Sequence, residues 1–296
     1  MSVPHILKVD IMKSENPMQF LVIGGQGKTG KRVVERLQNM ELPVRSISRK
    51  TSPAFDWNDS SGWAEALHGA DVVYATYQPD LAAEGAVEAV TALAELAFEQ
   101  GVKKIVLLSG RGEEAAAAAE QALQAASQKA GKSAVIVRAA WFMQNFTESF
   151  LLDGILHGEI ILPLAGNSAA TEPFIDADDI ADIVVAAMID DKHDGKIYEV
   201  TGSDLLNFEQ ITDKIAAATG KTIRFSALNP EDFRELMQAQ QVSDELIDLL
   251  IYLFVEGMDG RNSVITHDVE HVLGRKPRAF DDYVQQSHSL AAWQAQ

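Results

Sequence analysis

Four glycines near the start of the chain have the spacing of a turn that holds the phosphates of a dinucleotide. They follow an apolar run at residues 20–23 and precede apolar residues of helical period at residues 33–37, which indicates strand, tight turn and helix. A pyrophosphate would sit on the N–H groups that begin this helix, and a side chain at the turn would hold the backbone away from it. We therefore predict a phosphate site made by Gly24, Gly25, Gly27, Lys28, Thr29 and Gly30.

Gly27, Lys28 and Thr29 also resemble the end of the phosphate-binding loop of ATPases. That motif requires a glycine five positions before Gly27, where this chain has Val22, so the spacing excludes it. The remaining alternative is a glycine-rich turn without a ligand. The position of the turn between a strand and a helix favours cofactor binding.

Two cations, Arg49 and Lys50, end the second predicted strand at residues 42–50. In a doubly wound sheet this strand ends beside the adenosine ribose, where an acidic residue would hold the 2′-hydroxyl of NAD and an arginine would accommodate the 2′-phosphate of NADP. The pair therefore favours NADP(H), the alternative being solvated side chains after a strand. We expect Thr76 and Tyr77, which follow the strand at residues 71–76, to lie over the adenine and ribose.

Strands and helices alternate along the chain as in parallel βαβ units. We predict an α/β fold with a doubly wound parallel sheet and a smaller mixed α/β C-terminal lobe. Beyond the strands already named, we expect strands at residues 54–56 (weak), 103–110, 133–138 and 196–201, and a short strand followed by an acid-capped helix within residues 172–190. We expect further helices at 82–100, 112–131, 208–218, 230–240 and 243–255. The predicted domains are an N-terminal extension at 1–18, a Rossmann domain at 19–155 with sheet contributions from about 172–201, and a closing lobe at 202–296.

An aromatic-rich loop at residues 139–146 follows the strand at 133–138, at the sheet edge where ligands bind. Its residues either line a substrate pocket or belong to the core. Ser109, at the end of the strand at 103–110, either hydrogen-bonds the nicotinamide or a substrate oxygen, or caps the next turn. We expect Ser109 and Asn145 to orient the substrate. The predicted substrate-lining residues are Trp141, Phe142, Gln144 and Asn145.

Two groups of potential metal ligands are better explained structurally. The aspartates at residues 176–182 lack the glycine and terminal glutamate of a calcium loop and match the start of a helix. His267 and His271 are four apart, but no third ligand is evident. We predict no metal site.

The composition of the chain restricts its partners. The 296 residues carry 25 cationic and 43 acidic side chains, a formal charge of −18 that disfavours nucleic acid and anionic lipid. There are no cysteines, which excludes disulfides and a cysteine nucleophile. No apolar run approaches the roughly 20 residues of a membrane helix, and residues 1–18 lack a signal-like apolar core. We expect a cytoplasmic protein without membrane or nucleic-acid partners.

Five segments together resemble the NmrA-like branch of the atypical short-chain dehydrogenases. They read VIGGQGKTGKRV, SISRK, KKIVLLSGRGEE, VIVRAAWFMQNF and PFIDADDIADIVVAAM, and the resemblance covers roughly residues 19–280. The resemblance implies a Rossmann fold that binds NADP(H). It also implies one of two activities, since some relatives are similar to NADPH-dependent quinone, dye or imine reductases and others to inactive sensors of the NADPH to NADP ratio that bind transcription factors.

The chain departs from the broader superfamily in its proton donor. Those dehydrogenases use a tyrosine followed four residues later by lysine, and none of the five tyrosines here has that lysine. A nucleotide-sugar epimerase is disfavoured for the same reason. The sequence therefore favours an oxidoreductase that passes hydride from NADPH to a small quinone, imine or dye-like molecule, with a homodimer possible. The alternative is a catalytically inactive redox sensor that binds a protein partner.

Overall fold

The computed structural model describes residues 17–149 and 151–294, without the side chains of residues 287 and 288. The chain forms two compact units. The first unit contains the chain up to Ala139 together with Ala177–Val200 and Asp268–Arg275, and the second contains Ala140–Asp176, Thr201–His267 and the chain from Lys276. Residues 1–16 of the predicted extension lie outside the described residues.

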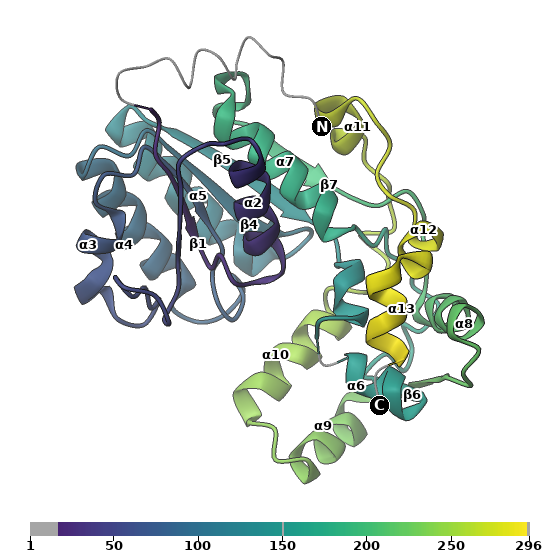
Figure 1. Ribbon diagram of the computed structural model, residues 1–296. Coiled ribbons are helices and arrows are strands. Elements are labelled where there is room, and N and C mark those ends of the chain that lie inside the picture. Colours follow the sequence, from purple (N-terminus) through teal and green to yellow (C-terminus); the bar gives the residue numbers. More distant parts are fainter. Residues whose placement is uncertain (1–16, 150, 295–296) are drawn as a thin grey trace. The chain divides into compact units, whose positions relative to one another are not determined.

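The first unit is built on a six-stranded parallel sheet in the order β2-β1-β3-β4-β5-β7 (Figure 1). The chain order reverses at β1, which lies between β2 and β3. Ligands bind at the carboxyl ends of strands where such a reversal occurs. The strands are β1 Phe20–Ile23, β2 Val44–Ile47, β3 Val72–Ala75, β4 Lys104–Gly110, β5 Ser133–Ala139 and β7 Ile197–Val200.

Helices cover both faces of this sheet, which confirms the predicted doubly wound α/β fold. Helix α2 packs against α7, and α4 packs against α5 and α3 (Figure 1). Apolar side chains such as Leu21, Val73 and Ile105 pack with residues of α3, α4 and α5 in one buried core. The helices are α2 Lys28–Asn39, α3 Trp63–Leu67, α4 Ala86–Glu99, α5 Glu114–Ala130, α7 Ala177–Ile189 and α11 Asp268–Leu273, with 3-10 turns η1 Ser60–Gly62 and η3 Asp191–His193.

Two short strands predicted from the sequence are wrong. At residues 54–56 there is only an isolated bridge between Asp56 and Asp59. The carboxylates of these two aspartates accept the N–H groups of Asn58 and Ser61, and such local bonds compete with a strand ladder. At residues 172–176 the backbone makes isolated bridges at Glu172 and Ile175 rather than a strand.

The second unit combines helices with a two-stranded parallel sheet, β6 Glu159–Leu162 and β8 Arg224–Ala227, which the sequence analysis did not predict. Its core gathers Phe146, Phe174 and Phe208. The three predicted helices of this region are confirmed, and their starts are capped by Asn207, Asn229 and Ser243. The helical elements are η2 Met143–Phe146, α6 Leu151–His157, α8 Phe208–Thr219, α9 Pro230–Ala239, α10 Asp244–Val255, α12 Phe280–Gln285 and α13 Ser287–Gln294.

The first continuous segment of the first unit ends at Ala139, whereas the Rossmann domain predicted from the sequence ends at residue 155. The first unit also includes Ala177–Val200, a segment that overlaps the expected sheet contribution at 172–201. The helices of the described residues include none that combines the length and the apolarity needed to cross a bilayer.

Candidate functional site

The turn between β1 and α2 is held in place by contacts to both neighbouring strands. The Gly24 N–H donates to the Ile47 carbonyl of β2 at 3.0 Å. On the other side, the Thr76 hydroxyl donates to the Ile23 carbonyl at 3.2 Å. The residues that follow β2 and β3 are therefore brought next to the glycine turn, at the carboxyl edge of the sheet.

Three of the four glycines are required by the packing of the protein itself. A Cβ at Gly24 would lie 2.2 Å from the Thr76 Oγ1, and the backbone there has a φ of +77°. A Cβ at Gly25 would lie 2.0 Å from the Ser46 Oγ, and one at Gly30 would lie 2.2 Å from the Gly24 carbonyl oxygen. These positions are closed by the surrounding chain, so glycine there explains the tight turn without a ligand.

Gly27 is less closely surrounded than the other three glycines. It precedes α2 with φ −76° and ψ 175°, a conformation open to any residue. A Cβ there would meet a single neighbour, the Gly24 carbonyl oxygen at 3.2 Å. The packing restricts this position less than the other three, and the close approach of a ligand to the start of α2 would also favour glycine here.

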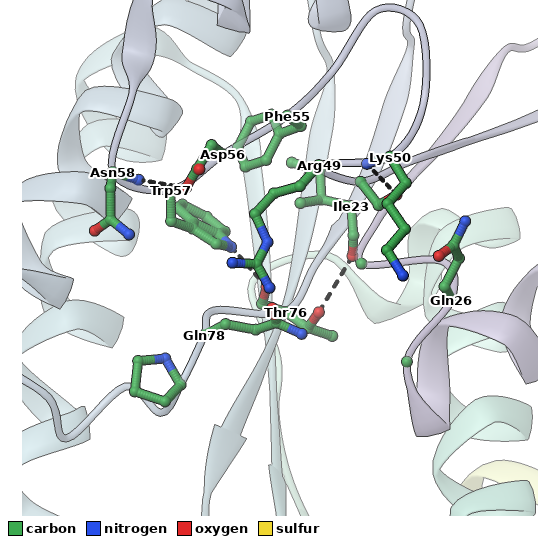
Figure 2. Close-up of a pocket in the computed structure, with 14 residues that line it drawn as sticks. Ile23, Gln26, Arg49, Lys50, Phe55, Asp56, Trp57, Asn58, Thr76 and Gln78 are labelled. Atoms are coloured by element: carbon green, nitrogen blue, oxygen red, sulfur yellow. Dashed lines mark hydrogen bonds between the residues drawn. The ribbon is translucent and has the colours of Figure 1, made fainter. Parts of the chain in front are cut away.

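A pocket of about 610 Å³ opens beside this turn (Figure 2). It extends from the β1–α2 turn to the residues after β2 and after β3. Its lining residues are Ile23, Gly24, Gln26, Gly27, Ser48, Arg49, Lys50, Phe55, Asp56, Trp57, Asn58, Thr76, Gln78 and Pro79. Among the predicted cofactor residues, Gly24, Gly27, Arg49, Lys50 and Thr76 are thus brought together.

Arg49 and Lys50 are exposed and line this pocket. Across the described residues, neither side chain makes a hydrogen bond or an ion pair. Figure 2 shows both side chains on the segment that follows β2, with Arg49 and Trp57 around the same pocket. Two cations without an anionic partner at a pocket wall are available to bind an anionic ligand.

Aromatic residues that the sequence analysis did not select form another wall of the pocket. The Trp57 Nε1–H donates to the Thr76 carbonyl at 2.9 Å, which fixes the indole ring. Its ring centroid lies 4.9 Å from that of Tyr77 and 5.1 Å from that of Phe55. The signal in the sequence was two aromatic residues within a polar loop directly after the cations.

Six predicted cofactor residues do not line the pocket: Gly25, Lys28, Thr29, Gly30, Tyr77 and Ser109. Thr29 is buried, and its hydroxyl accepts a hydrogen bond from Tyr74 at 2.9 Å. Its side chain therefore joins α2 to β3. The first turn of any helix still presents N–H groups that the helix itself does not satisfy, and residues 28–30 form that turn in α2.

Ser109 is buried at the end of β4, and its hydroxyl donates to the Glu120 Oε1 on α5 at 2.6 Å. Arg138 of β5 holds the same carboxylate through Nη2 at 2.6 Å and Nε at 3.0 Å. Arg138 also contacts Glu199 of β7 at 3.3 Å, and its pKa is raised by its hydrogen bond to Glu120. The Ser109 hydroxyl thus donates its only proton to another residue of the protein.

The predicted substrate-lining residues lie in the second unit. The Trp141 ring packs against Phe254 with 4.7 Å between centroids. Gln144 is completely buried, and its amide donates to the Asp176 Oδ1 at 2.8 Å, so it holds the core of this unit together. Phe142, just before the η2 turn, and Asn145, within it, are half-buried.

The acidic residues that begin α7 are bound by arginines. Asp178 contacts Arg32 at 3.2 Å and Arg36 at 2.7 Å, while Asp179 contacts Arg275 at 2.7 Å. Burial opposes the charge of Asp178, but these arginines lower its pKa overall. The described residues contain no group of three or more histidine, aspartate or glutamate side chains placed to hold a metal ion.

Comparison with known proteins identifies the family. Residues 18–284 match the NmrA-like family. The chain belongs to this family, as the sequence predicted. It is 27% identical over 288 residues to prestalk A differentiation protein A of Dictyostelium discoideum, covering 92% of this chain and 93% of that protein. It is 27% identical over 296 residues to an NAD(P)H azoreductase of Xenophilus azovorans, covering 92% and 98%.

The fold is shared with solved reductases. The structure of the Citrobacter sp. triphenylmethane reductase complexed with NADP(H) superimposes with a TM-score of 0.75. The alignment covers 91% of this chain and 100% of that protein, at 15% sequence identity. At this identity the match shows that the two proteins share a fold.

Proposed function

We propose that this protein is an NADPH-dependent reductase that transfers hydride to a small electrophile, namely a quinone, an imine or a dye-like molecule. The observation that carries the proposal is the pair of exposed cations, Arg49 and Lys50, at the wall of a pocket that begins at the β1–α2 turn. The azoreductase and the triphenylmethane reductase support the same class of reaction.

The residues of the pocket fit NADP(H). Gly27 leaves the backbone open at the start of α2, where the pyrophosphate binds in this fold. Arg49 and Lys50, which follow β2, would bind the 2′-phosphate of the adenosine. Trp57 and Thr76 supply a wall for the adenosine. When bound, the cofactor supplies a hydride from C4 of its nicotinamide.

The remaining predicted residues take roles in positioning the electrophile. Ser109 would accept a hydrogen bond from the nicotinamide amide or the substrate, because its own proton is directed to Glu120. In the second unit, Asn145 is the residue proposed to orient the electrophile. Trp141 and Phe142 would supply its apolar surroundings, and Gln144 a polar group. The protein contributes orientation and exclusion of water, which accelerate reactions without a covalent intermediate.

A second candidate function is a catalytically inactive NADP(H) sensor that binds a protein partner. The Dictyostelium relative favours it, because that protein is named for its part in differentiation rather than for a reaction. The internal hydrogen bond of Ser109 is consistent with it, because a serine that donates to Glu120 cannot also donate to a substrate.

Two measurements separate these functions. Titration with NADPH and with NADH tests the cofactor, and NADPH oxidation is then followed with a panel of quinones, cationic dyes, imines, aldehydes and ketones. Turnover of quinones, dyes or imines supports the reductase. Tight NADPH binding without turnover of any compound supports the sensor, and turnover of ketones alone contradicts the proposed acceptor class.

A further inference from the structure

The η2 turn of the second unit is held on both sides of Asn145 by residues that lie far from it in the sequence. Before Asn145, the Gln144 amide donates to the Asp176 Oδ1 at 2.8 Å. After it, the Phe146 carbonyl accepts the Nε1–H of Trp293 in α13 at 2.7 Å. Gln144 and Phe146 are both fully buried, so the backbone of the turn is fixed on either side of Asn145.

Helix α12 binds the residue that follows the turn. The buried Thr147 hydroxyl and the Tyr283 hydroxyl are hydrogen-bonded at 2.7 Å. The Tyr283 ring is itself buried and meets the Trp293 ring edge to face, with 6.1 Å between centroids. The helices α12 and α13, which pack against each other (Figure 1), therefore support η2 together.

Trp293 is a fixed support rather than an adaptable one. Its side chain is completely buried, and an indole has a single N–H donor and no acceptor, so the bond to the Phe146 carbonyl uses its whole capacity for hydrogen bonds. The Lys221 Nζ donates to the Trp293 carbonyl at 2.6 Å, which ties α13 to the segment after α8. A change at Trp293 must therefore be felt at η2.

The side chain of Asn145 differs from those of its neighbours. It is half-buried, and within residues 17–149 and 151–294 its amide group makes no hydrogen bond. The backbone N–H of Asn145 donates to the Phe142 carbonyl at 3.1 Å. An asparagine amide offers two N–H donors and an acceptor oxygen. The turn thus fixes the backbone of Asn145 and leaves its polar side-chain atoms available to a ligand.

We propose that α12 and α13 belong to the substrate site of the reductase, with Trp293 and Tyr283 as positioning residues that hold the Asn145 amide against an oxygen of a quinone. This inference rests on the proposed function. A quinone that receives hydride gains two electrons and one proton, which leaves one of its oxygens negatively charged until water supplies the second proton. The Asn145 N–H donates to this oxygen.

Such a donor distinguishes two classes of hydride acceptor. An N–H group that is held in place stabilises negative charge that develops on an oxygen during the reaction. A cationic triphenylmethane dye accepts hydride at a carbon and loses its positive charge, so it develops no such oxygen. The amide of Asn145 therefore favours quinones.

NADPH oxidation with a quinone and with a cationic triphenylmethane dye tests the role of Asn145. Because removal of one such donor costs about 10² to 10³-fold in kcat, Asn145→Ala should lose about 10²-fold or more with the quinone. The rate with the dye and the affinity for NADPH should change little. Equal losses with the two acceptors contradict a bond from Asn145 to the quinone oxygen.

A matched pair of threonine variants tests the support from α12. Thr147→Val removes the bond to Tyr283. Thr212→Val is the control, because Thr212 is also buried and its hydroxyl donates at 2.7 Å, but to the Phe208 carbonyl within α8. Both variants should lose similar stability in urea. Because a displacement of about 1 Å can cost 10²-fold in rate, only Thr147→Val should lose about tenfold or more in kcat with the quinone beyond any loss with the dye.

Trp293→Phe and Tyr283→Phe test the same support from the other side, since each keeps an aromatic ring and loses the hydrogen bond. Both should lower kcat with the quinone more than with the dye, at unchanged affinity for NADPH. If Thr147→Val behaves like Thr212→Val, or if the phenylalanine variants lose both acceptors equally, α12 and α13 have only a structural role.

The wild-type protein separates a failure of this inference from a failure of the proposed function. A protein that reduces the dye but not the quinone contradicts the inference and leaves the reductase in place. A protein that reduces neither contradicts both. With a protein that reduces the quinone alone, the comparison is with NADPH affinity, and a parallel loss of affinity and turnover in Asn145→Ala contradicts the inference.

Discussion

The Ser109 hydroxyl donates to the Glu120 Oε1 at 2.6 Å, joining the end of β4 to the helix packed beside it. Because Arg138 holds the same carboxylate from β5, the serine is one partner of a buried charged network. A hydrogen bond to a charged group contributes roughly 1.5–3 kcal/mol. Ser109→Ala should therefore lower the free energy of unfolding by about that amount, measured by urea denaturation of the cofactor-free protein.

The informative control for this substitution is Ser133→Ala, at the first residue of β5. The Ser133 hydroxyl is buried without a hydrogen-bond partner among the described residues, so its removal should change stability little. If Ser109→Ala leaves stability unchanged but abolishes turnover, the hydroxyl serves the substrate rather than Glu120.

The glycine turn gives a second prediction, because its positions differ in what surrounds them. Gly27→Val should keep the fold and lose dinucleotide binding, since the branched side chain would occupy the space into which a pyrophosphate fits. Gly30→Val should fail to fold, because its Cβ would lie 2.2 Å from the Gly24 carbonyl oxygen. Circular dichroism and NADPH titration measure the two effects. Retained affinity in folded Gly27→Val would mean that the turn does not hold phosphate.

Much of the first unit was predictable because its signals are local. Apolar runs specify the strands of the sheet, and the glycine spacing indicates the turn after β1. The weak strand at 54–56 failed for a local reason too: Asp56 and Asp59 bond to nearby backbone N–H groups.

The contacts that decide the site come from residues far apart in the sequence. Ser109 and Glu120, which are hydrogen-bonded, lie on different elements. The amide of Gln144 donates a hydrogen bond to Asp176, 32 residues later in the chain. The burial of the Glu113 carboxyl against Gly110 was not predicted, because an acid at a helix start has the appearance of a surface residue. The Trp57 indole is fixed at the pocket by its hydrogen bond to the Thr76 carbonyl, a contact that the periodicity of apolar residues does not predict.

The third prediction concerns the choice between NADPH and NADH. Arg49→Ala should remove charge-assisted hydrogen bonds to the 2′-phosphate, worth roughly 1.5–3 kcal/mol. The preference for NADPH should fall about tenfold or more, while the affinity for NADH stays nearly constant. Lys132→Ala, which removes an exposed cation that does not line the pocket, is the matched control. Equal affinities of the wild-type protein for both cofactors would refute the assignment.

The last prediction follows from the burial of Glu113 and concerns stability rather than turnover. The pKa of Glu113 is raised from 4.5 to about 8 in the folded protein. Between these values the folded protein binds more protons than the unfolded chain, so the free energy of unfolding must fall as the pH rises from about 5 to 8. Each unit of pKa difference corresponds to about 1.4 kcal/mol. Urea denaturation of the wild-type protein and of Glu113→Gln at pH 6, 7, 8 and 9 measures this slope. The glutamine cannot ionise, so the variant should lose less stability over this range and should gain on the wild-type protein most at pH 9, whereas parallel pH profiles would show that Glu113 titrates as an ordinary exposed glutamate.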